Sequence, residues 1–340
     1  MPGKIVVAGA LGLVGRAVLE HFEAKASFVS VDLTDAADSR AKLTPIQGVT
    51  HAVYCALFEK PDLGRGWLEA DQIATNLAML RNFLDGIEPG NSGLRHLSLL
   101  QGTKAYGIHL GPMNVPAKES SPRHPHPNFY WAQEDLIKAR QQGSSWTWTI
   151  FRPQVVIGFA VGSAMNMLTA VGVYAAISRE LGLPLVFPGV GRTVLEATDA
   201  RLLARAIAWA GNTPAAANQT FNVTNGDVFT WRNIWPVVAG QFGMEVGPSQ
   251  RMPLTVVMAD KADLWTEIVR KHGLRPYSYD ELIGSSWQFA DFSMGDRNGA
   301  TASIMSTIKI RQAGFADCID TEEMFRWWLG ELQRRRILPR

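Results

Sequence analysis

The stretch Gly9-Ala-Leu-Gly12-Leu-Val-Gly15 decides the fold of this 340-residue chain. It follows the β-branched run Lys4–Ala8 and opens a helical pattern over Leu13–Phe22. In such a loop one glycine permits a tight turn, the next lets the backbone approach a pyrophosphate, and the third lets the helix pack closely on the strand. The free amides and the positive end of the helix then receive the phosphates. We therefore expect a dinucleotide-binding loop rather than a plain tight turn, with contacts from Gly9, Leu11, Gly12, Leu13, Val14 and Gly15.

Short β-branched runs alternate with helical patterns through the first half of the chain, which favours βαβ units around a parallel sheet. Strands are expected at 4–8, 28–31, 50–56, 96–100 and 147–152, and helices at 13–22, 70–84 and 129–140. Later helices are expected at 165–177, 199–210 and 231–242, around a Pro/Gly-rich stretch at 182–191. The predicted fold class is α/β, a Rossmann-type doubly wound parallel sheet with a smaller, mainly helical substrate-binding lobe. Residues 1–160 would form the dinucleotide-binding domain, shortened after its first helix, and residues 161–340 the lobe, with some segments returning to the sheet.

Composition and charge narrow the function further. The 33 basic and 31 acidic side chains are balanced, so neither a nucleic-acid partner nor a membrane surface is indicated. Cys55 and Cys318 are the two cysteines, which excludes a disulfide framework and a cysteine-based zinc site. His124 and His126 lie in a proline-rich loop without a matching cluster, so no metal is expected. We expect a cytoplasmic protein that acts on a small molecule; a homodimer is left open.

Asp32 stands 17 residues beyond Gly15, at the end of Phe28-Val-Ser-Val. An acidic residue about 20 residues past the loop accepts hydrogen bonds from the adenosine ribose and repels a 2′-phosphate, which favours NAD over NADP. The alternative is an N-cap or turn aspartate, in which Asp32-Leu-Thr-Asp35 starts the next helix.

A lysine and a tyrosine supply the candidate catalytic groups. Lys104 follows the strand predicted at 96–100, and Tyr130 lies in Asn128-Phe-Tyr-Trp-Ala-Gln-Glu134-Asp. In the ordinary short-chain enzymes a lysine four residues after the tyrosine holds the cofactor ribose and lowers the phenol pKa. Glu134 occupies that position here. Lys104 can supply the charge instead, because strand ends on this face border the cofactor crevice.

Together these segments resemble the progesterone 5β-reductase/iridoid synthase-like enone reductases, atypical extended short-chain dehydrogenases/reductases. The resemblance covers nearly the whole chain, and its most specific part is Gln101-Gly-Thr-Lys104-Ala-Tyr106 together with Asn128–Asp135. It implies Tyr130 and Lys104 as the catalytic pair. It also implies cofactor contacts from Asp32, Leu33, Gln101, Pro153 and Val156, and a substrate pocket near Met165, Trp287 and Phe289.

The resemblance also changes the interpretation of Asp32. The run from Val31 resembles the family segment after the third strand, where the aspartate contacts adenine. Sixteen residues between Gly15 and Asp32 are too few for a helix, a strand, a loop and another strand. A right-handed crossover would by default place Phe28–Val31 beside the first strand, close enough for Asp32 to reach the ribose. The arginine-bearing loop that binds a 2′-phosphate is then missing. The resemblance to the family implies NADPH as the cofactor, whereas the missing loop leaves NADH possible.

The predicted activity is NAD(P)H-dependent reduction of the C=C bond of an apolar α,β-unsaturated carbonyl compound. Hydride would reach the β-carbon while the Tyr130 hydroxyl, supported by Lys104, meets the enolate oxygen. The alternatives are a carbonyl reductase or alcohol dehydrogenase that uses the same pair, and a non-catalytic cofactor-sensing protein.

Overall fold

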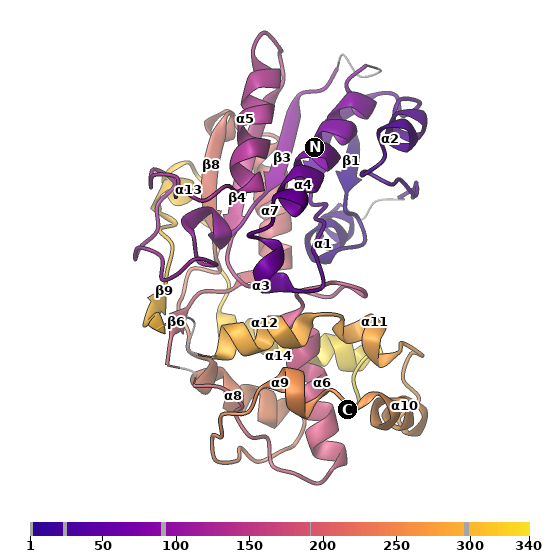
Figure 1. Cartoon of the computed structure of the whole chain (residues 1–340), viewed down its shortest axis with the longest axis vertical. Coiled ribbons are helices and arrows are strands. Elements are labelled where there is room, and N and C mark those ends of the chain that lie inside the picture. The colour runs from indigo at the N-terminus through magenta and orange to yellow at the C-terminus, as the bar shows by residue number, and fades with distance from the viewer. Residues whose placement is uncertain (1–2, 23–25, 90–92, 191, 296–298) are drawn as a thin grey trace.

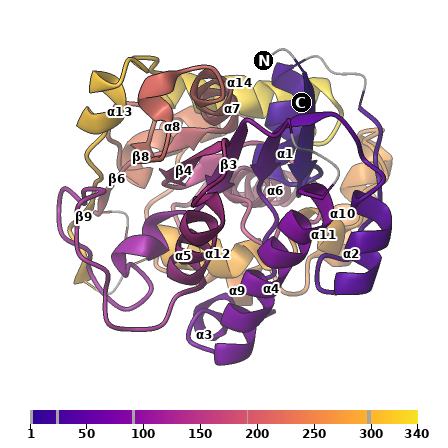
Figure 2. The same cartoon turned by 90° about the horizontal axis from the view of Figure 1, so that it is seen from above.

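A computed structural model describes residues 3–22, 26–89, 93–190, 192–295 and 299–340. Its centre is a five-stranded parallel sheet in the order β1-β2-β3-β4-β8 (Figures 1 and 2). The strands are β1 (Lys4–Ala8), β2 (Val49–Tyr54), β3 (His96–Leu100), β4 (Thr147–Pro153) and β8 (Gln219–Val223). The Rossmann-type α/β prediction is confirmed, because each parallel connection runs through a helix that covers the sheet.

Helices cover both faces of the sheet, as Figure 2 shows. One face carries α2 (Ala36–Leu43), α4 (Ala70–Ile87) and α5 (Phe129–Gln141), packed through Leu80, Phe83 and Ile137. The other carries α1 (Leu13–His21), α7 (Ala200–Ala210) and α13 (Ile308–Gln312). The strands are mainly apolar for this reason. The expected strands and helices of the first half lie within a few residues of their predicted bounds, with one exception.

The exception is the strand predicted at Phe28–Val31, which is wrong. These residues have no regular secondary structure and are not part of the sheet, and β2 is the one strand paired with β1 among the described residues. The helix α1 ends at His21 and α2 begins at Ala36, and residues 26–31 between them lie across a groove from β1 instead of pairing with it. As a result β1 lies at the edge of the sheet.

The mainly helical lobe lies below the carboxyl ends of the strands in Figure 1. Its core centres on Trp231, Trp235, Trp265 and Phe325, each no more than 1% exposed. The helices are α6 (Met167–Glu180), α8 (Trp231–Gln241), α9 (Leu254–Val257), α10 (Ala262–Lys271), α11 (Tyr279–Ile283), α12 (Ser286–Met294) and α14 (Thr321–Arg334). The three helices expected here correspond to α6, α7 and α8, of which α7 packs on the sheet together with β8.

Short elements complete the fold. These are α3 (Leu63–Gly66), the 3-10 helices η1 (Thr103–Tyr106) and η2 (Pro214–Ala216), and the two-residue strands β5 (Val156–Ile157), β6 (Val194–Leu195), β7 (Thr198–Asp199) and β9 (Ala302–Ser303). β5 pairs with β7, and β6 with β9. Within the described residues, no helix combines the length and apolar character that a membrane crossing needs.

Candidate active site

The glycine loop has the geometry that close phosphate approach requires. Gly9 has φ +75°, and a Cβ there would lie 2.8 Å from the Ala56 nitrogen. A Cβ on Gly15 would lie 2.3 Å from the Gly9 carbonyl oxygen, so this position brings α1 against the end of β1. Gly12 donates its N–H to the Gly9 oxygen at 3.0 Å and is the N-cap of α1. The three glycines therefore have distinct tasks, which are the turn, the cap and the packing of the helix.

The first turn of α1 leaves its amides available to a ligand. No side chain caps this end, so the N–H groups of Leu13, Val14 and Gly15 have no partner within the helix. A Cβ on Gly12 would meet a single neighbouring atom, the Gly9 oxygen at 3.3 Å, which leaves the space in front of the loop open. Leu11, at the tip, is 72% exposed. These residues fit the pyrophosphate of a dinucleotide.

A groove continues from this loop along the free edge of β1. It has a volume of about 890 Å³ and is lined by β1, by the glycine loop and by residues 26–31 on its far side. Leu33 also lines it, and the Leu33 carbonyl accepts a hydrogen bond from Asn82 at 2.9 Å. The groove occupies the place beside β1 where a further strand would pair.

Asp32 forms a local turn. Its Oδ1 accepts from the N–H of Thr34 at 2.9 Å and from the Thr34 hydroxyl at 2.6 Å. The Thr34 hydroxyl and amide lower the pKa of Asp32, which keeps its carboxyl ionised. Asp35 is the N-cap of α2 and accepts from Ala37 at 2.7 Å. The structure thus contains the Asx turn and N-cap that were the alternative interpretation of this segment.

Lys104 and Tyr130 come from two elements held together by one side chain. Lys104 lies in η1, directly after β3, and Tyr130 lies in the first turn of α5. Asn128, the N-cap of α5, accepts from the Tyr130 N–H at 2.9 Å and donates to the Lys104 carbonyl at 2.9 Å. Because Asn128 is 5% exposed, this bridge is a fixed part of the site.

The indole of Trp67 forms a common wall for the pair. The Lys104 Nζ lies 3.8 Å from the centre of the Trp67 ring, a cation–π contact. The Tyr130 and Trp67 ring centroids are 5.1 Å apart, in an edge-on arrangement. Trp67 itself is 2% exposed. The structure therefore brings together the two residues that the sequence proposed as a pair.

Burial changes the acid–base properties of both groups. Desolvation lowers the pKa of Lys104 to about 8, and the nearby Glu59 carboxylate opposes that change. Desolvation raises the pKa of Tyr130 well above its ordinary value, and Glu59 adds to the rise. At neutral pH the lysine is a cation and the tyrosine a neutral phenol, as a proton donor beside a developing oxyanion requires.

Glu134, which replaces the usual lysine, belongs to a buried network one turn after Tyr130. Its Oε2 accepts from Arg152 at 3.2 Å, and its Oε1 accepts from Lys138 at 2.6 Å. Arg152, 3% exposed, also donates to the Gln101 Oε1 at 2.9 Å. Gln101 in turn donates to the Tyr130 carbonyl at 3.0 Å. The side chain of Gln101, predicted to contact the cofactor, is thus used in joining β3, β4 and α5.

The strand end after Arg152 is conformationally unusual. Val155 has φ +34°, a value that a β-branched side chain rarely adopts. It separates Pro153, the last residue of β4, from Val156, the first of β5. The Pro153 carbonyl and the Tyr130 hydroxyl each lie 3.5 Å from where a Cβ on Gly102 would stand. Pro153, which is predicted to contact the cofactor, therefore lies close to the Tyr130 hydroxyl.

The three predicted pocket residues occupy different positions. The Met165 Sδ lies 3.9 Å from the Lys104 Nζ, which places Met165 at the catalytic pair. Trp287 is 6% exposed and donates to the Tyr279 hydroxyl at 2.9 Å. Phe289 packs against the lobe core. Met165 is thus beside the pair, whereas Trp287 and Phe289 contact residues of the lobe.

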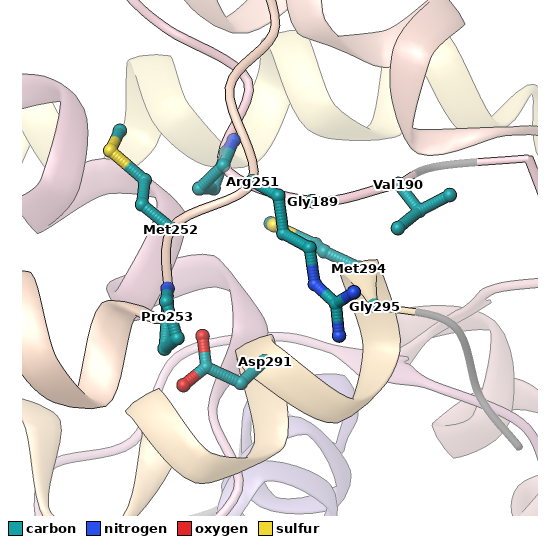
Figure 3. A pocket seen from close by; sticks show the side chains of 9 residues that line it. Gly189, Val190, Arg251, Met252, Pro253, Asp291, Met294 and Gly295 are labelled. Atoms are coloured by element: carbon teal, nitrogen blue, oxygen red, sulfur yellow. The ribbon is translucent and has the colours of Figure 1, made fainter.

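A separate small pocket lies within the lobe (Figure 3). Its volume is about 160 Å³, and its lining includes Met252, Asp291 and Met294. Figure 3 shows the guanidinium of Arg251 extending toward Gly295. Asp291 accepts from the backbone of Leu254 at 2.6 Å, so its carboxylate anchors α9. The pocket contains neither member of the catalytic pair.

Three residues of the site were not predicted from the sequence. Glu59 and Trp67 lie in the connection after β2, and Asn128 lies directly before the helix that carries Tyr130. A signal existed for Asn128, since an asparagine directly before a helical pattern is a common N-cap. Glu59 and Trp67 had none, because their contact with Lys104 joins residues far apart in sequence.

The sheet, the glycine loop and the converging Lys104 and Tyr130 define a Rossmann-type protein with the site of a nicotinamide-dependent reductase. A family model described as the PRISE-like Rossmann-fold domain matches residues 30–295. The chain belongs to this family, and the resemblance read from the sequence is confirmed.

Two relatives illustrate the family. The 3-oxo-Delta(4,5)-steroid 5-beta-reductase of Arabidopsis thaliana is 33% identical over 327 residues, covering 92% of this chain and 80% of the relative. The (S)-8-oxocitronellyl enol synthase of Catharanthus roseus is 32% identical over 325 residues, with the same coverage.

Solved structures agree on the fold. RMD from Pseudomonas aeruginosa, complexed with NADPH, has a TM-score of 0.69 at 15% identity and covers 98% of both chains. The Thermus thermophilus UDP-glucose 4-epimerase, in complex with NAD, has a TM-score of 0.63 at 17% identity, covering 97% of this chain and 98% of that one. At such identities the likeness extends to the architecture, not to the substrate.

Proposed function

We propose that this protein is an NAD(P)H-dependent reductase of the C=C bond of α,β-unsaturated carbonyl compounds. The observation that carries the proposal is the convergence of Lys104 and Tyr130 on the Trp67 ring at the carboxyl end of the sheet. The names of the relatives, a steroid 5-beta-reductase and an oxocitronellyl enol synthase, support an enone substrate. When bound, the reduced nicotinamide supplies the hydride.

Tyr130 would act on the carbonyl oxygen of the substrate. Its phenol is neutral, because burial raises its pKa, and it therefore can donate a hydrogen bond or a proton to the enolate oxygen that develops as the β-carbon is reduced. Lys104 adds a positive charge on the same side of the site. Donors fixed in a dry site before the reaction are worth about 3–4 kcal/mol of barrier each.

The substrate would lie against apolar and polarisable surfaces. Met165 stands beside the Lys104 ammonium, and the lobe has an apolar core that includes Trp287 and against which Phe289 packs. A thioether side chain adapts to the outline of an apolar ligand. A small apolar enone fits this environment better than a charged nucleotide sugar does.

We further propose that NADH is accepted at least as well as NADPH. The ionised Asp32 lies next to the groove beside β1, and an aspartate here repels a 2′-phosphate. Among the described residues that line the groove, Lys4 is the one basic residue, and its ammonium is bonded to the Gln47 carbonyl. No described lining residue is an arginine that could pair with the phosphate.

The test measures nicotinamide oxidation with NADH and NADPH separately, over small enones, steroid enones and saturated ketones. We expect oxidation with enones and none with ketones. The reverse pattern would replace the proposal by carbonyl reduction, and tight cofactor binding without any turnover would indicate a cofactor sensor.

Tyr130→Phe removes the hydroxyl and leaves the ring on Trp67. We expect turnover to fall by about two orders of magnitude or more, while cofactor binding, followed by nicotinamide fluorescence, persists. Tyr277→Phe is the matched control, since Tyr277 packs against the lobe core away from the pair. Full activity of Tyr130→Phe would remove Tyr130 from the mechanism.

A further inference from the structure

Glu59 is a buried carboxylate whose position is fixed by nitrogen donors. It lies in the connection between β2 and α3, and its side chain is 5% exposed. Each of its two oxygens accepts from the Trp67 Nε1 at 3.0 Å, and Oε2 also accepts from the Gln72 Nε2 at 3.1 Å. A carboxylate out of water needs such donors, because an unpaired buried charge is strongly unfavourable.

The backbone around Glu59 is held by two amide side chains of α4. Gln72 and Asn76 are one turn apart and completely buried. Asn76 accepts from the Phe58 N–H and donates to the Phe58 carbonyl, both at 2.9 Å. Gln72 accepts from the Lys60 N–H at 3.1 Å. The residues on each side of Glu59 are therefore clamped to α4, which accounts for two polar side chains inside an apolar helix face.

The lobe fixes the same connection from the opposite side. Gln288, in α12, donates to the Pro61 carbonyl at 2.9 Å and accepts from the Leu63 N–H at 3.2 Å. Glu59 consequently has little freedom to move relative to either part of the molecule.

Lys104 is the cation that faces this carboxylate. Its Nζ lies 3.8 Å from the Glu59 Oε1, and among the described ion pairs this is the one that Lys104 makes. From the other elements, His109 faces it from the loop after η1 and Tyr130 from α5, while the His124 Nε2 lies 3.3 Å from the Lys104 backbone carbonyl. Burial, followed by the charge of Lys104, lowers the pKa of His109 to about 3, so His109 is neutral at assay pH. The negative charge beside Lys104 therefore comes from Glu59.

We propose that Glu59 is a positioning residue, which holds the Lys104 ammonium charged and seated on the Trp67 ring beside Tyr130. The inference rests on the proposed function only in taking Lys104 and Tyr130 as the working pair. The same indole donates to Glu59 and carries the ammonium, so one side chain sets both partners of the ion pair. Glu59 acts through Lys104 and does not have to touch the substrate.

The first experiment needs no substrate. Competitive labelling of the cofactor-free protein with acetic anhydride, read by mass spectrometry, reports the unprotonated fraction of Lys104 against pH. We expect a midpoint near pH 8 in the native protein. In Glu59→Gln the midpoint should fall by about one pH unit or more, since a carboxylate within 4–6 Å stabilises the charged form by that much.

Matched variants separate charge from shape. Glu69→Gln removes a partner of the neighbouring Lys60 and should leave the Lys104 midpoint unchanged. Glu59→Asp keeps the charge farther from Lys104, so its midpoint should fall between those of the native protein and Glu59→Gln. An unchanged midpoint in Glu59→Gln, or equal changes in the Asp and Gln variants, would overturn the proposal.

A kinetic readout then connects Glu59 to turnover. If kcat/KM requires protonated Lys104, its alkaline decline should move to lower pH in Glu59→Gln by the same interval as the labelling midpoint. An alkaline decline that stays in place while the midpoint moves would remove Lys104, and Glu59 with it, from the reaction. Absence of enone turnover in the native protein would refute the proposed function alone, because the labelling result does not depend on it.

Discussion

Glu196 predicts a pH dependence of stability. It lies between β6 and β7, is 5% exposed, and makes no ion pair among those of the described residues. Its Oε2 accepts from the Met305 N–H at 2.6 Å and from Gln154 at 3.4 Å, while Oε1 lies 3.1 Å from the Thr224 hydroxyl. Burial raises the pKa of Glu196 to about 7, against the effect of these hydrogen bonds.

The direction of this pH dependence follows from the difference between the pKa of Glu196 in the folded protein and its pKa in the unfolded chain. The unfolded chain releases this proton near pH 4.5, whereas the folded protein holds it to about pH 7. Raising the pH through this window therefore favours the unfolded state, and the change is complete above about pH 8. The two pKa values, 4.5 and about 7, differ by an interval that, at about 1.4 kcal/mol per pH unit, lowers the free energy of unfolding by about 3 kcal/mol.

Glu196→Gln should abolish this loss. An amide oxygen in the Oε2 position still accepts from Met305 and Gln154, and the amide nitrogen can donate to the Thr224 hydroxyl, which donates to Oε1 in the native protein. The assay is urea unfolding followed by tryptophan fluorescence, from pH 4.5 to pH 8.5. We expect the variant to gain about 3 kcal/mol relative to the native protein across this range.

The matched control is Glu267→Gln, which changes an exposed carboxylate in α10. Its difference from the native protein should stay flat over the same range, because this carboxylate lies in water in the folded protein as it does in the unfolded chain. If the Glu196→Gln difference is equally flat, Glu196 is already ionised in the folded protein at low pH, and the reasoning from burial fails.

Two further predictions concern the glycine loop and the buried ion pair. Gly15→Ala should weaken dinucleotide binding at least about tenfold in fluorescence titrations, because its Cβ would lie 2.3 Å from the Gly9 oxygen. Gly240→Ala, where a Cβ meets nothing within 4 Å, should bind normally. Glu134→Ala should lower the free energy of unfolding by about 3 kcal/mol or more by stranding the Arg152 guanidinium, whereas loss of the exposed Asp135 carboxylate should cost less than about 1 kcal/mol.

Local sequence patterns were enough for much of the fold. The strands at Lys4–Ala8 and His96–Leu100 have the predicted bounds, because short, mainly apolar runs between turn signals are typical of a sheet that helices cover on both faces. The spacing of Gly9, Gly12 and Gly15 predicted the loop, because each glycine is required by the local geometry of the turn, the helix cap or the helix packing. Lys104 and Tyr130 could be predicted as a pair because Lys104 follows a strand and Tyr130 begins a helix at the same edge of the sheet.

Other features depend on contacts that no local pattern encodes. Phe28–Val31 has the composition of a strand, yet it lies across the groove from the free edge of β1 and pairs with no strand among the described residues. Glu59 meets Lys104 across 45 positions of sequence, through a connection that α4 and α12 shape together. From sequence alone, a charged residue in a loop is expected to be exposed to solvent, because its buried partners are not visible there.

The buried guanidinium of Arg152 explains why Glu134 stands where the ordinary short-chain enzymes have a lysine. In the short-chain enzymes with the usual spacing, the turn after the tyrosine supplies the cation; here β4 presents the 3% exposed Arg152 guanidinium to that turn. A lysine at position 134 would place two cations together out of water, at a cost of several kcal/mol, whereas a glutamate balances the charge. The cation beside Tyr130 must then come from another element, and η1 provides it as Lys104. Because that second cation is also largely desolvated, it needs an anion of its own, which the connection after β2 supplies as Glu59.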